Sequence, residues 1–307
     1  MKNSFLLILL LCGTLAAQSL QNVTVSTVPT PAGERFSFPV FGASDNDLFF
    51  TKDNFIGLWH SSLSNGDVRQ LNTAQGAGYQ PVISSDGSLV FYRSDEFVDM
   101  KRFTRVFSLN MNDNRVQELL PASRFVSELH GSDNSIVFTV DNTLRGISND
   151  GALLTEAKLT AATYAHIDNG SISLHHQGSK RILRPLGEGN YIWVSVSPDK
   201  SSLLFTLAGR GTYITDLQGT VKAELGYANA PVWSPDGAYV AYMIDRDNGT
   251  DFTASELGLY SVATGTHTAL TSTDNEIELY PAWSPSGKKI ACATQSGALL
   301  IYSFEIE

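Results

Sequence analysis

The stretch Ala230-Pro231-Val232-Trp233-Ser234-Pro235-Asp236-Gly237-Ala238-Tyr239-Val240-Ala241-Tyr242 recurs fifty residues later as Tyr280-Pro281-Ala282-Trp283-Ser284-Pro285-Ser286-Gly287-Lys288-Lys289-Ile290-Ala291-Cys292. In both copies a Ser-Pro-Asp-Gly or Ser-Pro-Ser-Gly turn separates two apolar runs. Proline presets φ at the second turn position, and glycine takes the left-handed position that closes a hairpin. Each copy is therefore predicted to form two antiparallel strands joined by a tight turn.

Related turns recur along the chain and divide it into units. The spacings between successive turns are 41, 47, 35, 31, 37 and 50 residues, with no helical pattern between them. Each unit continues with an aliphatic-aromatic strand and a second tight turn. A period near forty residues with this content is typical of a propeller blade of four antiparallel strands. The residues that mark the turns are Asp45, Asp86, Asp133, Asp168, Asp199, Asp236 and Ser286.

Seven such units predict an all-β fold, a β-propeller with seven blades. Six blades are the alternative, because the fourth unit, about residues 163–189, has room for only three strands. The seventh unit ends at Glu307, directly after its third strand. The alternating run from Val23 to Val28 is the one strand-like segment without a unit, so we expect it to complete the last blade. That pairing closes the ring and protects an exposed strand edge.

The N-terminus has the pattern of a secretory signal peptide. Lys2 precedes the apolar run Phe5–Leu11, and small residues including Ala16 and Ala17 follow it. The run is too short to span a bilayer stably, and cleavage is expected after Ala16 or Ala17. The predicted organisation is a signal peptide at 1–17 and a single propeller domain at 18–307. Lipid attachment at Cys12 is an alternative, although Leu11 departs from the small residue that a bacterial lipobox places before its cysteine.

Composition restricts the partners of the exported chain. The formal net charge of −10 becomes −11 once Lys2 is removed, so nucleic acid and anionic lipid are not expected partners. No second apolar run suits a transmembrane segment after the signal is removed. Cys292 is the one remaining cysteine and lies in an apolar strand, so it is expected to be a small buried hydrophobe. The protein is expected to be a monomer.

The repeated motif also carries a family resemblance. Pro-x-Trp-Ser-Pro-Asp-Gly, followed by an apolar strand and a Leu-Tyr strand, resembles the WD40-like (PD40) repeats of TolB-like periplasmic proteins and of prolyl oligopeptidase relatives. The resemblance implies a propeller and, for TolB-like proteins, a role in periplasmic protein complexes of the cell envelope. It does not extend to TolB itself, which carries an α/β domain before its propeller. The expected location is the periplasm, with secretion or lipid anchoring as alternatives.

No motif predicts a catalytic residue. The Gly-x-Ser-x-Gly elbow of the hydrolytic relatives is absent from the sequence. His175 and His176 are adjacent in a predicted strand, so their side chains point to opposite faces. His166 and Asp168 could share a face near the central channel, but a turn aspartate with a half-exposed histidine is the simpler interpretation.

One segment has the acidic spacing of a calcium loop. Asp245, Asp247, Asp251 and Glu256 occupy positions 1, 3, 7 and 12 of a twelve-residue stretch. Calcium needs several oxygen ligands that converge on one point. Gly249 at position 5 and Thr250 at position 6 break the pattern, so a polar hairpin loop is the favoured interpretation. No cofactor is predicted beyond this weak calcium candidate.

The long insertions all fall on one predicted side of the disc. They lie between second and third strands and between blades, at about residues 95–104, 245–256 and 272–279. They carry a surplus of carboxylates together with apolar residues, which is what the centre of an interface with a basic partner needs. A solubilising acidic surface is the alternative. The predicted partner-binding residues are Asp95, Glu96, Phe97, Asp99, Met100, Phe103, Phe252, Asp274, Glu276 and Glu278.

These observations favour a non-catalytic, exported propeller that binds an envelope protein, peptide or other ligand. The alternative is a propeller enzyme, a lyase or glycosidase acting on an envelope or extracellular polymer at the central channel. The fold alone does not decide between them, because propellers host many unrelated functions.

Overall fold

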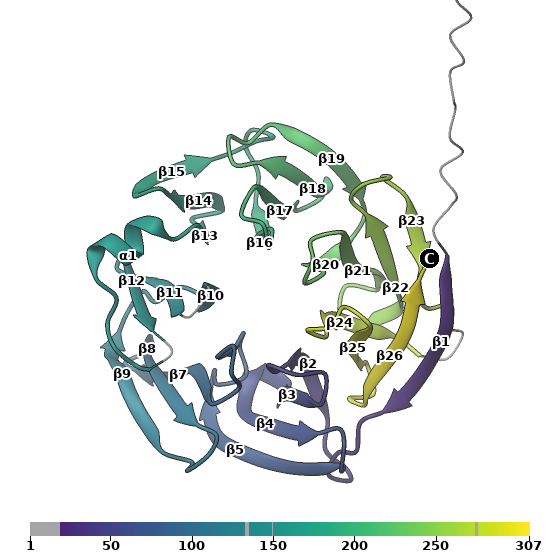
Figure 1. Cartoon of the computed structure of the whole chain (residues 1–307), viewed down its shortest axis with the longest axis horizontal. Coiled ribbons are helices and arrows are strands. Elements are labelled where there is room, and N and C mark those ends of the chain that lie inside the picture. Colours follow the sequence, from purple (N-terminus) through teal and green to yellow (C-terminus); the bar gives the residue numbers. More distant parts are fainter. Residues whose placement is uncertain (1–18, 133–134, 149, 274–275) are drawn as a thin grey trace, which may run out of the picture.

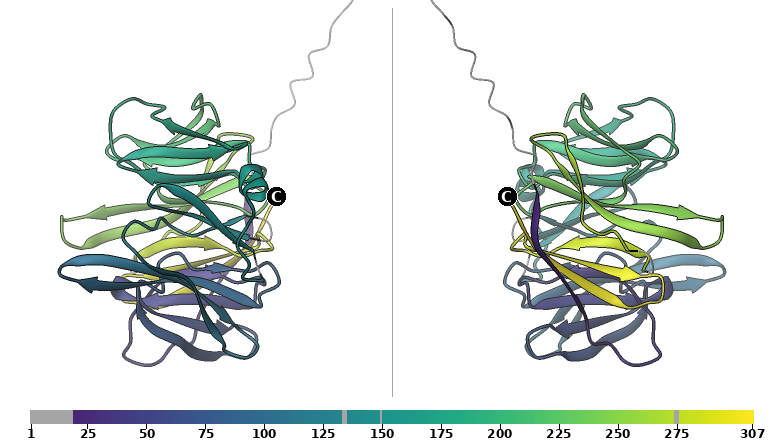
Figure 2. Two further views of the ribbon diagram at one scale, coloured as in Figure 1. Left: turned by 90° about the vertical axis from the view of Figure 1, so that its left-hand side faces the viewer. Right: turned by 90° about the vertical axis from the view of Figure 1, so that its right-hand side faces the viewer.

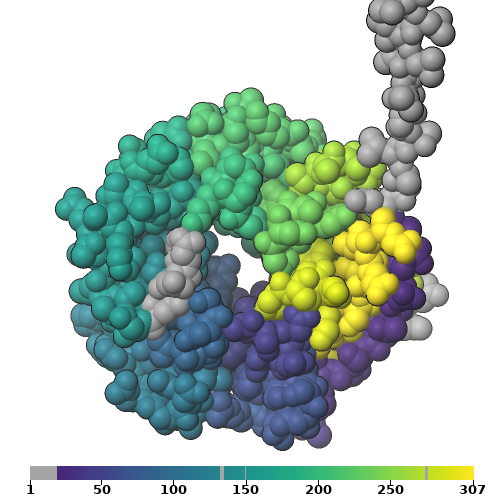
Figure 3. All heavy atoms as spheres, in the orientation of Figure 1, coloured from purple at the N-terminus to yellow at the C-terminus, as the bar shows by residue number. Residues whose placement is uncertain are grey.

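The computed structural model describes residues 19–132, 135–148, 150–273 and 276–307. Over these ranges the chain forms seven antiparallel sheets around a central axis (Figure 1). The space-filling view has an opening through the middle of the ring (Figure 3). The fold is an all-β, seven-bladed propeller, as the sequence predicted, and the six-bladed alternative is wrong. The predicted signal peptide at 1–17, with Cys12, lies outside the described residues.

Four blades have four strands that follow one another in sequence, here called inner, second, third and outer. Blade 1 contains β2 (Phe36–Phe41), β3 (Asp47–Lys52), the short 3₁₀ turn η1 (Asp53–Phe55), β4 (Ile56–Ser62) and β5 (Asp67–Gln75). Blade 2 contains β6 (Val82–Ile83), β7 (Leu89–Val98), β8 (Lys101–Asn110) and β9 (Val116–Ser123). Blade 5 contains β16 (Tyr191–Val196), β17 (Ser202–Leu207), β18 (Gly211–Asp216) and β19 (Val221–Gly226). Blade 6 contains β20 (Asn229–Trp233), β21 (Tyr239–Asp247), β22 (Phe252–Ser261) and β23 (His267–Ala269).

Blade 7 combines the two ends of the described chain. It contains β24 (Glu278–Trp283), β25 (Lys289–Thr294) and β26 (Leu299–Ile306), and its outer strand is the N-terminal β1 (Leu20–Thr27). β1 pairs antiparallel with β26, with Thr27 opposite Leu300 (Figure 1). This confirms the prediction that the run from Val23 closes the ring.

The repeated turn is held by one serine and one aspartate. In blade 6 the Ser234 carbonyl accepts the Gly237 N–H at 2.9 Å. The Ser234 hydroxyl donates to Asp236 at 2.6 Å and accepts the Tyr239 N–H at 2.9 Å, so it joins the turn to the start of the second strand. Blades 2 and 5 repeat the network, and hydrogen bonds from Ser84 and then Ser88 lower the pKa of Asp86 to about 2.

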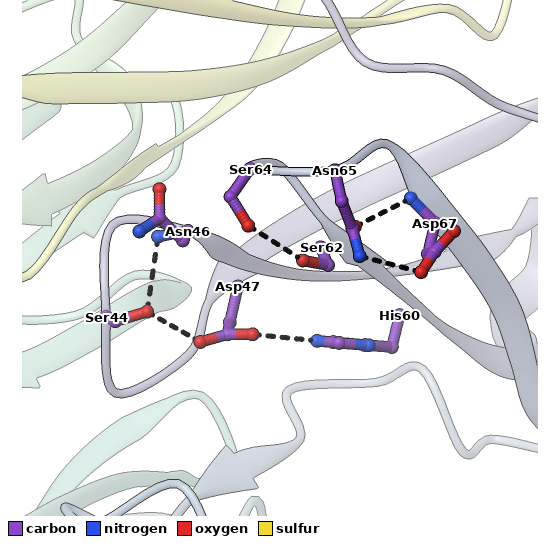
Figure 4. A network of polar contacts seen from close by, with 8 residues as sticks. All are labelled: Ser44, Asn46, Asp47, His60, Ser62, Ser64, Asn65 and Asp67. Carbon is purple, nitrogen blue, oxygen red and sulfur yellow. Dashed lines mark hydrogen bonds and ion pairs between the residues drawn. The ribbon is translucent and has the colours of Figure 1, made fainter.

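Both kinds of tight turn lie on the same side of the disc. In blade 1, Ser44 donates to Asp47 at 2.6 Å, and His60 Nε2 lies 3.1 Å from the other oxygen of that carboxylate. The carbonyl of Asn46 accepts the Leu63 N–H at 2.7 Å, which joins the inner–second turn to the third–outer turn. Polar residues of both turns crowd together (Figure 4). We call this side the turn face.

The opposite side carries the long hairpins. β7–β8 and β21–β22 both project well beyond the rest of the disc, in the same direction (Figure 2). We call this side the hairpin face. The connections between second and third strands and between blades open on this face (Figure 2), so the insertions lie on one side of the disc, as the repeat pattern predicts.

Blades 3 and 4 each have three strands. Blade 3 contains β10 (His130–Ser132), β11 (Ser135–Val140) and β12 (Thr143–Ser148), and blade 4 contains β13 (Tyr164–Asp168), β14 (Ser171–His176) and β15 (Ser179–Leu183). The four-strand pattern of the repeat predicts an outer strand in blade 3, and that prediction is wrong. Leu153 makes one isolated bridge to Ile147, and the helix α1 (Glu156–Ala161) follows. Ala, Leu, Lys and Glu dominate this segment and favour helix over strand.

The strand missing from blade 4 is the inner one. The β13–β14 turn lies on the hairpin face, since the Gly170 carbonyl accepts the N–H of Tyr191, where blade 5 begins. A second–third turn belongs there, whereas an inner–second turn would lie on the turn face. The C-terminal end of β15 resembles the end of an outer strand. Pro185, which follows β15, packs against Gly219 in the third–outer turn of blade 5. Pro29 follows the outer strand β1 and packs in the same way against Gly66.

The three strands of blade 4 are therefore its second, third and outer strands. Asp168 ends β13, directly before the turn at Asn169-Gly170, and the prediction that this turn is equivalent to those at Asp86 and Asp236 is wrong. Asp-Asn-Gly suits either kind of tight turn, so the local sequence could not distinguish them. Asp133 lies outside the described residues.

The core lies between neighbouring blades. Leu204 and Ile214 of blade 5 pack with Val240 and Tyr242 of blade 6, and Trp233 packs against this cluster. Between blades 3 and 4 the cluster has three buried members, Val137, Ala162 and Tyr164, with Leu159 of α1 among the side chains at its edge. This interface is small because an outer and an inner strand are both missing there. Cys292 is buried, as expected, and burial raises the pKa of its thiol.

Candidate functional site

The hairpin β7–β8 presents apolar side chains at its tip. Asp99 and Met100 form a two-residue turn in which both have positive φ, 50° and 59°. Such turns match the twist of a hairpin, but a methionine at positive φ is uncommon. Met100 is 99% exposed, Phe97 66% and Val98 51%. Exposed apolar residues grouped on a projecting hairpin are typical of a contact surface.

Two of the hairpin's carboxylates are already neutralised within it. Asp95 accepts the Thr104 hydroxyl at 2.6 Å and lies 3.9 Å from Arg102. Glu96 pairs with Arg105 at 3.1 Å. Of the three acidic residues predicted to contact a partner here, Asp95 and Glu96 are thus paired with arginines of the same hairpin, and Asp99 remains at the turn. The exposed apolar side chains therefore dominate the tip.

A further aromatic residue extends this surface onto the disc. The guanidinium of Arg124 stands 5.5 Å from the ring centre of Phe103, on the hairpin, and 5.3 Å from that of Phe125. Phe125 is 66% exposed. We define the tip patch as Phe97, Val98, Met100 and Phe125. Phe125 was not predicted, since it lies in the connection between blades and no repeat position marks it.

In the second hairpin, β21–β22, the four carboxylates of the weak calcium candidate do not converge on one point. Asp245 is opposite Ser255 and Glu256 is opposite Ile244, so the two carboxylates point to opposite faces of the sheet. Asp245 accepts Asn229 at 2.8 Å, whereas Glu256 accepts the Thr271 hydroxyl at 2.6 Å. Asp247 accepts the Gly249 N–H and, like Asp251, lies at the tip. Across the described residues no three His, Cys, Asp or Glu side chains are arranged to hold a metal.

The third predicted insertion contributes less surface than expected. Glu276 is exposed, but Glu278 is fully buried and accepts the Tyr302 hydroxyl at 2.9 Å. The prediction that Glu278 lies on the binding face is wrong, because β24 begins at this residue and turns its side chain into the blade 6–7 core. Burial raises the pKa of its carboxyl. Phe252 is half-buried against the same core, and Asp274 lies outside the described residues.

A row of aromatic rings lies on blades 7, 1 and 2. Tyr280 stacks on Phe38 with ring centres 4.1 Å apart, Phe38 lies 4.5 Å from Phe55, and Phe55 lies 4.8 Å from Tyr79. Phe38 and Tyr280 both have positive φ at a bulge in an inner strand. A cavity of about 450 Å³ lies beside them, lined also by Arg35, Asp53 and Asp247.

This aromatic row was not predicted from the sequence. Phe38-Pro39 and Tyr280-Pro281 occupy equivalent positions before the turns at Asp45 and Ser286. This aromatic-proline pair is the signal that could have found them.

A second cavity, of about 530 Å³, lies between blades 3 and 4. Its lining includes Phe125, Thr139, Asp141, His166 and Asp168. His166 and Asp168 do share a face, but they line this cavity from a second strand rather than an inner one. His166 is 3% exposed, and its Nδ1 has no hydrogen-bond partner within the described chain. Burial, then the neighbouring His175, lower the pKa of His166 to about 4, so its imidazole is neutral at pH 7.

A buried polar network fixes the blade 3 wall of this cavity. The guanidinium of Arg93 lies 4.4 Å from the ring centre of Tyr79 and donates to the Ser127 carbonyl at 3.1 Å. The hydroxyls of Ser127 and Tyr164 are 2.7 Å apart, and Tyr79 donates to Glu128 at 3.2 Å. A buried charge with several partners holds its surroundings rigid. The cavity wall is therefore preformed.

Comparisons with known proteins support the fold and no finer identity. The chain matches no family model, and no curated protein matches it. It is similar to oligogalacturonate lyase from Vibrio parahaemolyticus, at 12% identity over 94% of this chain and 96% of that one, with a TM-score of 0.59. The β-propeller domain of Cps50 (Swd1) from Myceliophteria thermophila is similar at 12% identity over 91% of this chain and 99% of that one, also with a TM-score of 0.59. An enzyme and a domain of a different protein thus share the fold, and similarity at this level defines the class of protein as a seven-bladed β-propeller. In the described ranges no helix has the length and apolarity needed to cross a membrane.

Proposed function

We propose that this protein is an exported, TolB-like propeller that binds a protein partner of the cell envelope, in the periplasm, through its hairpin face. The signal-like sequence at 1–17 supports export, and the two related copies Trp-Ser-Pro-Asp-Gly and Trp-Ser-Pro-Ser-Gly support the family assignment. The partner contacts the tip patch first, and it needs an apolar surface more than a basic one, because Asp95 and Glu96 are paired within the hairpin.

The observation that carries the proposal is the exposure of Met100, Phe97 and Val98 at the end of a long hairpin. An ordinary soluble surface has scattered apolar residues, whereas these three lie within four residues of chain at the end of one hairpin, with Phe97 and Val98 on its opposite faces, and stand away from the disc. Interfaces take most of their affinity from a few such residues once water is excluded around them. The turn face carries tight polar turns instead.

Site-specific crosslinking in the native envelope tests the proposal. A photo-crosslinking residue at position 100 is expected to capture one defined partner, and the same residue at Val221, exposed on an outer strand near the turn face, is expected to capture none. The purified partner should then bind the Phe97→Ser, Met100→Ser variant at least roughly tenfold more weakly than the wild type, as expected for interface anchors. Equal capture from both positions, or unchanged binding of the double variant, would exclude the hairpin as the binding element.

An enzyme that acts on a polymer is the second candidate. The observation in its favour is the cavity beside the Phe38–Tyr280 stack, where Arg35 and the carboxylates of Asp53 and Asp247 are also present. Release of unsaturated or reducing sugar products from acidic polysaccharides, oligogalacturonate included, measures this activity directly. Product formation that is lost on replacing Asp53 and Asp247 with Asn would favour the enzyme over the binding module.

A further inference from the structure

Three imidazoles surround one buried tyrosine where blades 3 and 4 meet. His130 comes from β10, the inner strand of blade 3, and its ring centre lies 5.0 Å from that of Tyr164. The ring centres of His166 and His175, on β13 and β14 of blade 4, lie 5.0 Å and 5.8 Å from that of Tyr164 and 5.8 Å from each other. We call His130, His166 and His175 the histidine cluster. It places ionisable groups on both sides of the joint between the two blades.

The two faces of blade 4 differ in chemistry. Toward blade 5, β13 and β14 present Ala165, Ile172 and Leu174 to a large apolar core. Side chains alternate along a strand, so the opposite face, toward blade 3, carries Tyr164 with the two histidines of blade 4. The buried apolar cluster on that side is small, and Val137 is the buried side chain that blade 3 contributes to it. The joint therefore has histidines where the interface between blades 4 and 5 has aliphatic side chains.

The imidazoles lack partners that would stabilise a proton on them. His166 is 3% exposed, and neither its Nδ1 atom nor the Nε2 atom of His175 has a hydrogen-bond partner within the described chain. In the described ranges the histidine that pairs with a carboxylate is His60, which lies in blade 1 and contacts Asp47. Protonation of the histidine cluster would therefore bury charges without counter-ions.

The charged groups around the cluster do not supply a negative surplus. Within the described residues there are three of each sign, Glu128, Asp141 and Asp168 against Arg93, Arg102 and Lys180. The other titratable groups there are the phenols of Tyr79 and Tyr164, whose pKa values are raised by burial, so both stay neutral in acid. The acidic and basic groups balance, so the surroundings favour neutral imidazoles.

The titration of the cluster is linked to the closure of the joint. Burial lowers the pKa of all three imidazoles, and for His166 burial and then His175 lower it to about 4. A histidine in contact with water titrates near about 6.5, so the open joint binds more protons than the closed one. The stability that closure provides is fully present above about pH 6.5 and is lost as the pH falls toward about 4.

We propose that the joint between blades 3 and 4 is an acid-sensitive switch, which opens locally when the histidine cluster is protonated while the other blades stay packed. Protonation puts positive charges on both sides of the joint, and they repel one another and the buried guanidinium of Arg93. Opening separates the hydroxyls of Ser127 and Tyr164, now 2.7 Å apart, and exposes the imidazoles to water. The small apolar cluster at the joint opposes this only weakly. The inference concerns the ring itself and does not rest on the partner proposed above.

Hydrogen exchange of backbone amides in the whole mature chain tests the switch. Exchange is followed by mass spectrometry at pH 7 and pH 5, with each rate corrected for the chemical exchange rate at that pH. Titration of His166 alone changes the opening equilibrium by about twentyfold between these values, so residues 164–176 should exchange at least roughly tenfold faster at pH 5. Exchange in β17 and β21, of blades 5 and 6, should change less than about twofold. A uniform change in all blades, or no change in residues 164–176, would overturn the proposal.

Variants that cannot be protonated identify the groups responsible. The double variant His166→Phe, His175→Phe keeps aromatic rings beside Tyr164 and should exchange at pH 5 within about twofold of its rate at pH 7. The matched control is His176→Gln, since His176 is next in sequence, points to the opposite face of β14 and contacts the Thr163 hydroxyl at 2.9 Å. This control should keep the full acceleration in acid. Acceleration that persists in the double variant would contradict the role of the cluster.

Two further measurements complete the test. If the double variant does not fold, His130→Gln removes the charge that blade 3 contributes, and it should reduce the acceleration in residues 164–176 at least roughly threefold. An unchanged acceleration in that variant would also count against the cluster. Returning the wild type from pH 5 to pH 7 should restore protection completely. A loss of protection that is not reversed would indicate acid denaturation and contradict a switch.

Discussion

At the scale of single residues, the serine–aspartate turn explains why the repeat is visible in the sequence. The serine hydroxyl both donates to the aspartate and accepts the N–H at the start of the next strand, so neither residue is easily replaced. Blade 7 departs from this pattern, because Ser286 stands where blades 2, 5 and 6 have aspartate. Asp45 of blade 1 compensates across the blade boundary, since it accepts the Ser286 N–H at 3.0 Å and its hydroxyl at 2.6 Å.

This exchange between blades predicts a rescue. Asp45→Ala should lower the free energy of unfolding by about 1 kcal/mol, because two hydrogen bonds to a carboxylate are lost at an exposed site. Adding Ser286→Asp should recover part of that loss, since the introduced carboxylate would accept the Ser284 hydroxyl as in blades 2, 5 and 6. In the wild-type background the same Ser286→Asp change should destabilise, because two carboxylates would then face each other. Chemical denaturation of the four proteins measures the coupling, and strictly additive effects would contradict the inter-blade bond.

At the scale of elements, the regular blades could be predicted and the irregular ones could not. Ser234-Pro235-Asp236-Gly237 identifies an inner–second turn because proline and serine fix its geometry. Asp168-Asn169-Gly170 contains only residues common to all tight turns, so its place in the blade depends on strands that are missing nearby. Blade 3 similarly ends in α1, where local helix preference replaces the strand that the period predicted. The predicted binding residues on β7–β8 were located by their place between strands. Phe125 lies in a connection between blades that no repeat position marks, and the cavity between blades 3 and 4 lies where two strands are missing, so neither could be predicted from the repeat.

The packing of α1 against blade 3 predicts a second rescue. Gly146, on β12, has no side chain, and a Cβ built there would lie 2.6 Å from Leu154 and 2.7 Å from Leu159 of α1. Gly146→Ala should therefore destabilise the protein by about 1–3 kcal/mol through overpacking. Leu159→Ala removes one of the two clashing side chains, so the double variant should be more stable than the sum of the single effects predicts. Thermal unfolding of the single and double variants tests this, and a neutral Gly146→Ala would show that α1 is not packed tightly on β12.

At the scale of the whole molecule, stability depends on joining the two ends of the chain in one blade. β1 pairs with β26 along nearly its whole length, and Ser19 and Glu307 exchange two backbone hydrogen bonds at 3.2 Å. Val28, just beyond β1, is buried with Phe36 and Ile301 between blades 7 and 1. Blades 3 and 4 lack strands and share a small core, so the ring is already weak on its other side. If the β1–β26 pairing is also lost, the ring has two weak junctions, one in blade 7 and one between blades 3 and 4, and we expect it to open readily.

Removal of residues 1–27 tests this dependence. The truncated protein loses the whole outer strand of blade 7 and exposes β26 as an unprotected edge, which is a template for aggregation. We expect a fall in melting temperature of well over ten degrees, or insoluble protein, because losing a strand removes many backbone hydrogen bonds together with its buried contacts. Removal of residues 1–18 alone should leave the melting temperature unchanged, since β1 begins at Leu20. A synthetic peptide with the sequence Leu20–Val28, added to the longer truncation, should restore solubility by reoccupying the outer position. An equally stable protein without β1 would mean that the inter-blade cores alone hold the ring, and that ring closure by the N-terminal strand contributes little.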